Sequence, residues 1–92
     1  MTMRVALICI DKAEHLHVRT ENRSAHLKHI EDSGVVEMAG PFLDGNGQMC
    51  GSLVVLDVAG IDEARAWADA DPYAKAGLFA SVDIREWKKV IG

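Results

Sequence analysis

Short, densely apolar runs alternate along the chain with longer polar stretches. Residues 5–10 are apolar at consecutive positions and rich in β-branched side chains, and Asp11-Lys12 closes the run. A run this short with that composition is typical of a buried strand. From residue 16 to residue 33 the spacing becomes helical, and Gly34 is a typical C-terminal stop. The first third of the chain therefore predicts a strand followed by a long helix.

The helical segment has one candidate buried stripe. At about 100° per residue, the stripe contains Leu16, Arg19, Arg23, Leu27 and Ile30. His26 falls at the edge of this stripe, and His29 is expected well outside it.

The rest of the chain predicts three more strands and a second helix. Residues 35–39 form a strand that Gly40-Pro41 is expected to break, a turn cluster spans residues 44–47, and residues 52–58 form a third strand. A helix begins after Gly60 and ends at Asp71-Pro72, because the residue before a proline avoids helical geometry. Residues 79–87 complete the pattern as a last strand.

This order, β-α-β-β-α-β, predicts an α+β protein of the ferredoxin-like class, with two helices on one face of an antiparallel sheet. The first and third strands do not alternate, since both are apolar on both sides. An apolar sheet face is not expected to stay in water. The chain predicts no further element to cover it, so a homodimer that packs through this face is expected.

Length and charge narrow the class of protein. The 92 residues suit one domain, residues 1–92, with one core. A net charge of −4 argues against a nucleic acid or an anionic membrane as partner, because both require clustered basic residues. The two cysteines form no C-x-x-C motif, and the apolar run near the N-terminus is too short for a membrane span. We therefore expect reduced thiols and a cytoplasmic location.

Several short motifs, in order, resemble the YciI-like family. They are Arg23-Ser24-Ala25-His26-Leu27, Ala39-Gly40-Pro41, Gly51-Ser52, the segment from Ala66 to Tyr73 that contains Asp71-Pro72, and Lys88-Lys89-Val90. The resemblance covers essentially the whole chain and implies a fold similar to the dimeric α+β barrels that include muconolactone isomerases. It also implies a cleft shared by His26 of the first helix and Asp71 of the Asp-Pro motif. Ser24 departs from the pattern, in which a proline often follows the arginine.

The physical character of the two residues allows more than one role. An imidazole can give and take protons near neutral pH, so His26 could act as a general acid or base if a carboxylate fixes its tautomer. It could equally be a boundary histidine that only packs. Asp71 precedes Pro72 and a Gly77 stop, which is typical of a helix N-cap. A capping carboxylate can still orient an imidazole, so cap alone and cap with dyad both remain open.

Three further residues are candidates for substrate binding. Arg23 lies one turn before His26 and could hold an anionic substrate, or form a surface ion pair. Ser52 could place a hydroxyl near the cleft, or simply begin a strand. Tyr73 could line the cleft or merely pack. Gly40-Pro41 is expected to shape the pocket.

A metal site is not predicted. His15 and His17 are two residues apart, and His26 and His29 are three apart, but no ligand set completes either pair. Cys50 has no basic cluster nearby that would make it a catalytic thiol. No nucleotide-binding or acyl-serine motif is present, so no cofactor is expected.

The sequence therefore favours a cofactor-independent enzyme acting on a small anionic or hydroxylated ring or enol compound. His26 would transfer a proton, Asp71 would orient it, and the reaction would be an isomerisation or an elimination. The alternative is a non-catalytic module that binds a small ligand, with a structural contact between His26 and Asp71.

Overall fold

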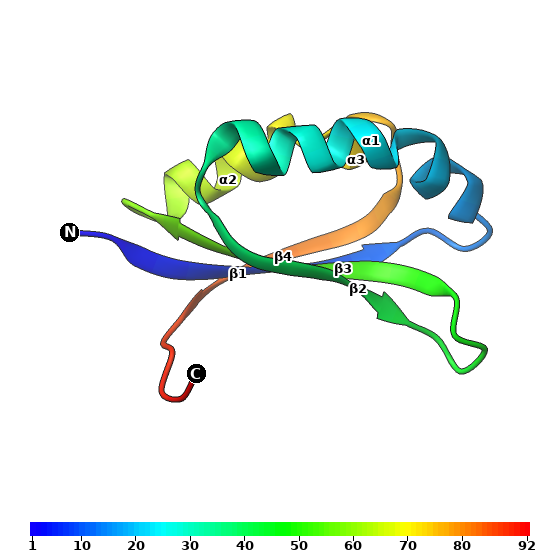
Figure 1. The fold of residues 1–92 in the computed structure, drawn as a ribbon. Coiled ribbons are helices and arrows are strands. Elements are labelled where there is room, and N and C mark those ends of the chain that lie inside the picture. Colours follow the sequence, from blue (N-terminus) through cyan, green and yellow to red (C-terminus); the bar gives the residue numbers. More distant parts are fainter.

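One four-stranded antiparallel sheet, in the order β2-β3-β1-β4, carries the helices on a single face, as Figure 1 shows. The computed structural model describes all 92 residues. The elements are β1 (Met3–Asp11), α1 (Leu16–Ser33), β2 (Val36–Leu43), β3 (Met49–Val58), α2 (Ile61–Ala70), α3 (Pro72–Lys75) and β4 (Phe79–Trp87). The predicted α+β, ferredoxin-like class is confirmed.

The core lies between the central strands and the second helix. Alternate residues of β1 and β3 point toward the helices, where Val5 is paired with Leu56 and Leu7 with Val54. Together with three residues of α2 they form one buried cluster: Val5, Leu7, Cys9, Val54, Leu56, Val58, Ala64, Trp67 and Ala68. This period-two burial fixes the register, because a slip by one residue would turn the whole set away from the helices.

Helix α1 contributes no residue to this buried apolar cluster. Its only fully buried residues are Arg19 and His26, and both are polar. Leu27, expected on the buried stripe, is 47% exposed. His29, expected outside that stripe, lies against α2, where its Nε2–H donates to the Trp67 carbonyl at 3.1 Å and its ring packs on the indole. The reason is that α1 faces its helical neighbours as well as the sheet.

The second strand is longer than predicted. It continues through Gly40-Pro41, and Pro41 is paired with Ser52 of β3. The expectation that this dipeptide breaks the strand is therefore wrong. Strand β2 lies at the edge of the sheet, where only one side of the backbone has a neighbour, so a missing N–H is tolerated.

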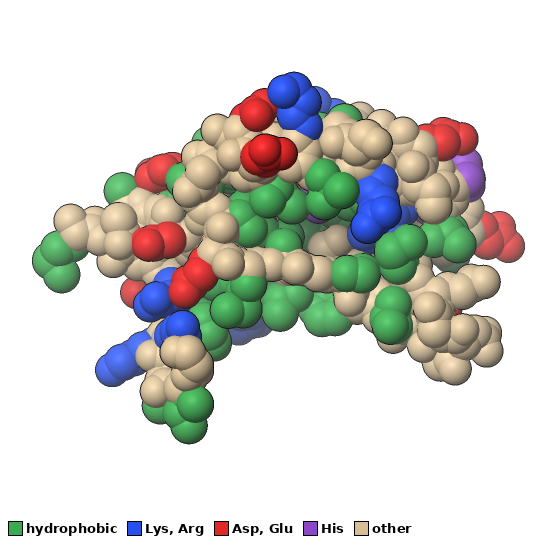
Figure 2. Space-filling model, in the orientation of Figure 1, with side chains coloured by type: hydrophobic (Ala, Val, Ile, Leu, Met, Phe, Trp, Pro, Cys, Tyr) green, Lys and Arg blue, Asp and Glu red, His purple; other side chains and the backbone are tan.

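The sheet face away from the helices carries many apolar side chains. Six of them are only partly buried or are exposed: Ile8, Ile10, Met38, Phe42, Leu53 and Trp87. Figure 2 shows hydrophobic side chains on both sides of the sheet, in the hollow under α1 and below the strands. None of the three helices combines the length and the apolar character that crossing a membrane requires.

Candidate functional site

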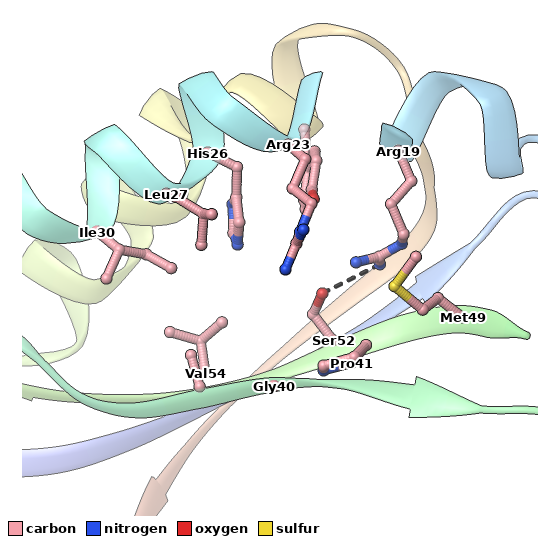
Figure 3. A pocket seen from close by; sticks show the side chains of 12 residues that line it. Arg19, Arg23, His26, Leu27, Ile30, Gly40, Pro41, Met49, Ser52 and Val54 are labelled. Carbon is pink, nitrogen blue, oxygen red and sulfur yellow. Dashed lines mark hydrogen bonds between the residues drawn. The ribbon is translucent and has the colours of Figure 1, made fainter. Parts of the chain in front are cut away.

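A cavity of about 180 Å³ lies between α1 and the strands β2 and β3. Six of its twelve lining residues are hydrophobic, and the polar side chains come from Arg19, Arg23, His26, Ser52 and Tyr73. Figure 3 shows the α1 side chains Arg19, Arg23 and His26 pointing down toward the sheet, with Ser52 of β3 pointing up toward them. A cavity of about 150 Å³ is enough to take up benzene. The hollow is therefore large enough for one small ring.

His26 and Asp71 meet at the back of this cavity, although 45 positions separate them in the sequence. The Nδ1 of His26 lies 2.8 Å from Oδ1 of Asp71, and both side chains are buried. The same carboxylate oxygen accepts the backbone N–H of Tyr73 at 3.0 Å, which is the N-cap hydrogen bond of α3. A carboxylate can only accept here, so Nδ1 carries the hydrogen and donates it. Asp71 is thus both a helix cap and the partner of the imidazole.

The second nitrogen of His26 faces the cavity. Nε2 has no hydrogen-bond partner in the protein. Every side-chain nitrogen and oxygen that is fully buried does have a partner, so Nε2 is not fully buried. Nε2 must therefore reach open space, and His26 is among the residues that line the cavity. Because the ring hydrogen is on Nδ1, where it is donated to Asp71, Nε2 of the neutral imidazole presents a lone pair to the cavity. This is the geometry of a general base.

Tyr73 forms the wall behind the imidazole. Its ring stacks on His26 with centroids 3.9 Å apart and packs edge-on against Phe79. Burial raises the pKa of the Tyr73 hydroxyl above its ordinary value, although Arg19 and Arg23 act in the opposite direction. The hydroxyl therefore keeps its proton through neutral pH and can donate a hydrogen bond. Tyr73 both lines the cavity and packs, which were the two alternatives left open by the sequence.

A second polar cluster, formed by Arg19, Asp11 and Ser52, lies at the other end of the cavity, and of these three residues the sequence had pointed only to Ser52. Arg19 binds Asp11 through two hydrogen bonds, Nε to Oδ2 and Nη2 to Oδ1, each 2.8 Å long. Nη2 also donates to the Ser52 hydroxyl at 3.0 Å. Burial works against the charge of Arg19, but the contact with Asp11 outweighs it and raises the pKa of the guanidinium. The sequence did carry a signal for this pair, because Arg19 was predicted on a buried stripe and a buried charge needs a partner of opposite charge.

The other candidate residues divide between cavity and surface. Arg23 lines the cavity, is exposed, and makes no ion pair with any side chain of the protein. Ala39, Gly40 and Pro41 of β2 form the wall opposite α1, as their motif led us to expect. Cys50 does not line the cavity; its thiol lies 3.6 Å from the Phe42 carbonyl oxygen.

The remaining cysteine and histidines stand apart from this chemistry. Burial, with a smaller contribution from Asp71, raises the pKa of Cys9 to about 12, so its thiol stays neutral and unreactive. The rings of His15 and His17 lie 5.9 Å apart, near the start of α1. Neither histidine lines the cavity.

Comparison with known proteins places the chain in a family. The YCII-related domain matches residues 3–88. The chain belongs to the YCII-related domain family. It is 38% identical over 89 residues to the protein YciI of Escherichia coli O6:H1 and to that of Shigella flexneri, covering 87% of this chain and 91% of each relative. An uncharacterized protein of Haemophilus influenzae is 33% identical over 76 residues. The resemblance to YciI seen in the sequence is confirmed.

A solved structure that resembles this chain over nearly its whole length is that of an enzyme. It is 5-chloro-2-hydroxyhydroquinone dehydrochlorinase (TftG) of Burkholderia phenoliruptrix AC1100, in complex with 2,5-dihydroxybenzoquinone. The two folds agree with a TM-score of 0.87 at 30% identity, over 94% of each chain. A structure from Bordetella bronchiseptica, named for antibiotic biosynthesis monooxygenases, has a TM-score of 0.57 at 9% identity and shares the fold alone.

Proposed function

We propose that this YCII-related protein is a small-molecule enzyme that removes a leaving group from a hydroxylated ring or enol, without a cofactor, by proton transfer through His26. The observation that carries the proposal is the orientation of His26, whose Nδ1–H is engaged by Asp71 while Nε2 opens into a ring-sized cavity. The similarity to a dehydrochlorinase supports the same class of substrate and reaction.

The proposed step is balanced without an external oxidant. Nε2 of His26 accepts the proton of a ring hydroxyl, and the electron pair left on oxygen enters the ring. A ring carbon that bears the leaving group takes up a proton to give the keto tautomer. A second hydroxyl, on losing its proton, then expels the leaving group with its bonding pair, for example as chloride. The net change is the loss of one proton and one anion, and Asp71 stabilises the imidazolium that forms in between.

The first test is release of chloride from 5-chloro-2-hydroxyhydroquinone by the purified protein. Replacing His26 by Ala removes the acid–base group, and we expect the rate to fall by about 10²- to 10⁴-fold. His17→Ala is the matched control, because this exposed histidine of the same helix lies outside the cavity. A H26A variant that stays folded and keeps its rate within threefold would contradict the proposal.

A second readout is independent of the leaving group. In D2O, an enzyme that protonates a ring carbon also exchanges ring C–H hydrogens for deuterium, which proton NMR of 2,5-dihydroxybenzoquinone detects. Binding of this compound without exchange or turnover would favour the alternative function, a module that holds a small ligand.

We also propose that a second copy of the chain covers the outer sheet face. The support is the partly exposed apolar surface there, with a hollow of about 280 Å³ lined in part by Met38, Phe42 and Leu53. Apolar surface of this kind is the usual material of a homodimer interface. Light scattering at micromolar concentration is expected to give twice the chain mass, and Ile8→Lys, in the middle of this face, is expected to give the mass of one chain. A monomeric wild-type protein would refute this.

A further inference from the structure

Arg19 is held unusually firmly for a cavity-lining arginine. It is 3% exposed, is bound twice by Asp11 and donates to Ser52, so two nitrogens of its guanidinium are fixed. The guanidinium also contacts the Tyr73 side chain. Arg19 still lines the cavity, and Figure 3 shows an end of its guanidinium directed into the cavity toward Arg23 and His26.

Arg19 and His26 lie against the same aromatic ring. The guanidinium carbon of Arg19 is 4.8 Å from the centroid of Tyr73, and the imidazole centroid is 3.9 Å from it. Positions 19 and 26 are two helical turns apart, so their side chains leave α1 on the same face. Both residues line the cavity, so one small planar ligand there can meet Nε2 of His26 at one edge and the guanidinium of Arg19 at another.

We propose that Arg19, positioned by Asp11 and Ser52, is the anion-binding residue of the site, and that it selects planar ligands carrying a delocalised oxyanion such as a phenolate or enolate. This deepens the proposed function, on which it rests for the identity of the ring. A fixed N–H donor in a buried site is effective because it needs no reorganisation when charge gathers on the oxygen. The negative charge of Asp11 balances the positive charge of Arg19, so the guanidinium can remain charged while buried.

Arg23 has a different place in this arrangement. It is exposed and free of ion pairs, so it adds positive potential at the cavity without a fixed geometry. A flexible charge raises the local concentration of an anion, whereas a clamped fork fixes its orientation. Arg19 is therefore expected to govern which anion binds, and Arg23 mainly how strongly anions in general are attracted.

The competing view is that Arg19 only fastens α1 to the sheet, since its contacts reach Asp11 at the end of β1 and Ser52 in β3. A purely structural arginine would matter for stability and not for the choice of ligand. Ligand discrimination is therefore the readout that separates the two views.

The experiment compares two ligands by calorimetry. 2,5-Dihydroxybenzoquinone is an anion at neutral pH, because each hydroxyl is conjugated to a carbonyl as in a carboxylic acid, and hydroquinone of similar size is neutral. Arg19→Met is expected to weaken binding of the anion about 10- to 100-fold, the usual loss for a charge-assisted hydrogen bond, while hydroquinone binding changes less than threefold. Arg65→Met, on the exposed surface of α2 and outside the cavity, is the matched control and keeps wild-type discrimination.

A measurement on the unaltered protein covers the case in which R19M fails to fold. NMR of the arginine Nε–H signals is expected to show a shift for Arg19 on titration with the dianion and none with hydroquinone, while Arg85 on the outer surface stays unchanged. Unchanged Arg19 signals at saturation, equal affinities of wild type and R19M, or no binding of the anion by the wild type would each overturn the inference. Anion binding that depends on Arg19 without any turnover would instead refute the proposed function and leave this inference standing.

Discussion

Replacing Asp71 by Asn and by Ala separates the charge of this residue from its geometry. The Oδ1 atom accepts two hydrogens, from the Tyr73 backbone and from His26. Asparagine also has an Oδ1 acceptor and caps helices about as well as aspartate, so D71N can keep both contacts while losing the negative charge. Alanine loses the charge, the cap and the partner of the imidazole together.

The size of each effect follows from these contacts. In D71A the lost cap costs about 1 kcal/mol, and the buried Nδ1–H left without an acceptor costs about 1–3 kcal/mol. In D71N the hydrogen bonds weaken from charge-assisted to neutral, which costs about 1 kcal/mol. For a domain of this size about 1 kcal/mol corresponds to a change of about 4–8 °C in Tm. D71A is therefore expected to melt more than about 10 °C below wild type, and D71N by less than about 8 °C.

Activity is expected to follow charge and not stability. Without the carboxylate the imidazolium loses its stabilising partner, and an amide N–H can also favour the wrong tautomer, so kcat for chloride release should fall by about 10²-fold or more in D71N. Asp69→Asn on the exposed surface of α2 is the matched control. If D71N keeps kcat within threefold of wild type while its Tm is nearly unchanged, the carboxylate serves only as a helix cap and the acid–base reasoning fails.

Two further predictions concern the scaffold. Because burial raises the pKa of Cys9 to about 12 and a free thiol ionises at about pH 8.5, the unfolded chain loses a proton above pH 9 that the folded chain keeps. The free energy of unfolding should thus fall with rising pH between 9 and 12, by up to about 1.4 kcal/mol per pH unit from this group. Urea titrations across this pH range should show a shallower fall for Cys9→Ala, and an equal pH dependence for the two proteins would contradict this. A Cβ at position 51 would lie 2.4 Å from the Cys9 carbonyl oxygen, within the paired strands, so Gly51→Ala should lower stability by about 2 kcal/mol or more. Gly45→Ala, with open space around it, should leave the urea midpoint unchanged, and equal midpoints for both variants would refute the steric argument.

The elements that the sequence predicted best are those near residues that start or stop a helix. The first helix spans Leu16–Ser33 and the last strand Phe79–Trp87, both at the predicted bounds. Gly34 ends the first helix in a left-handed conformation at φ 67°, and Asp71-Pro72 separates α2 from α3. The extent of β2 was missed because strand length depends on pairing with β3. Whether Gly40-Pro41 ends a strand is decided by its place at the sheet edge, which no local pattern reveals.

The features of the site also separate into those that the local sequence reveals and those that depend on tertiary contacts. The capping role of Asp71 is local and was visible, whereas its contact with His26 depends on how α1 crosses the start of α3. Family resemblance suggested that contact, and the structure brings the two side chains together. The pair Arg19 and Asp11 was missed because Asp11 was interpreted only as the end of a strand. The catalytic and binding roles of His26, Asp71, Arg23, Ser52 and Tyr73 stay predictions.

The wall of the cavity is a partition one strand thick. Ala39, Gly40 and Pro41 border both the cavity under α1 and the hollow on the outer face. Met38 and Phe42 line only the outer hollow, whereas the three residues between them line both. A molecule that packs on the outer face therefore contacts the same stretch of backbone that forms a wall of the cavity under α1. If the cavity under α1 binds a substrate as proposed, substitutions on the outer face are therefore expected to change which ring it accepts, without touching that ring.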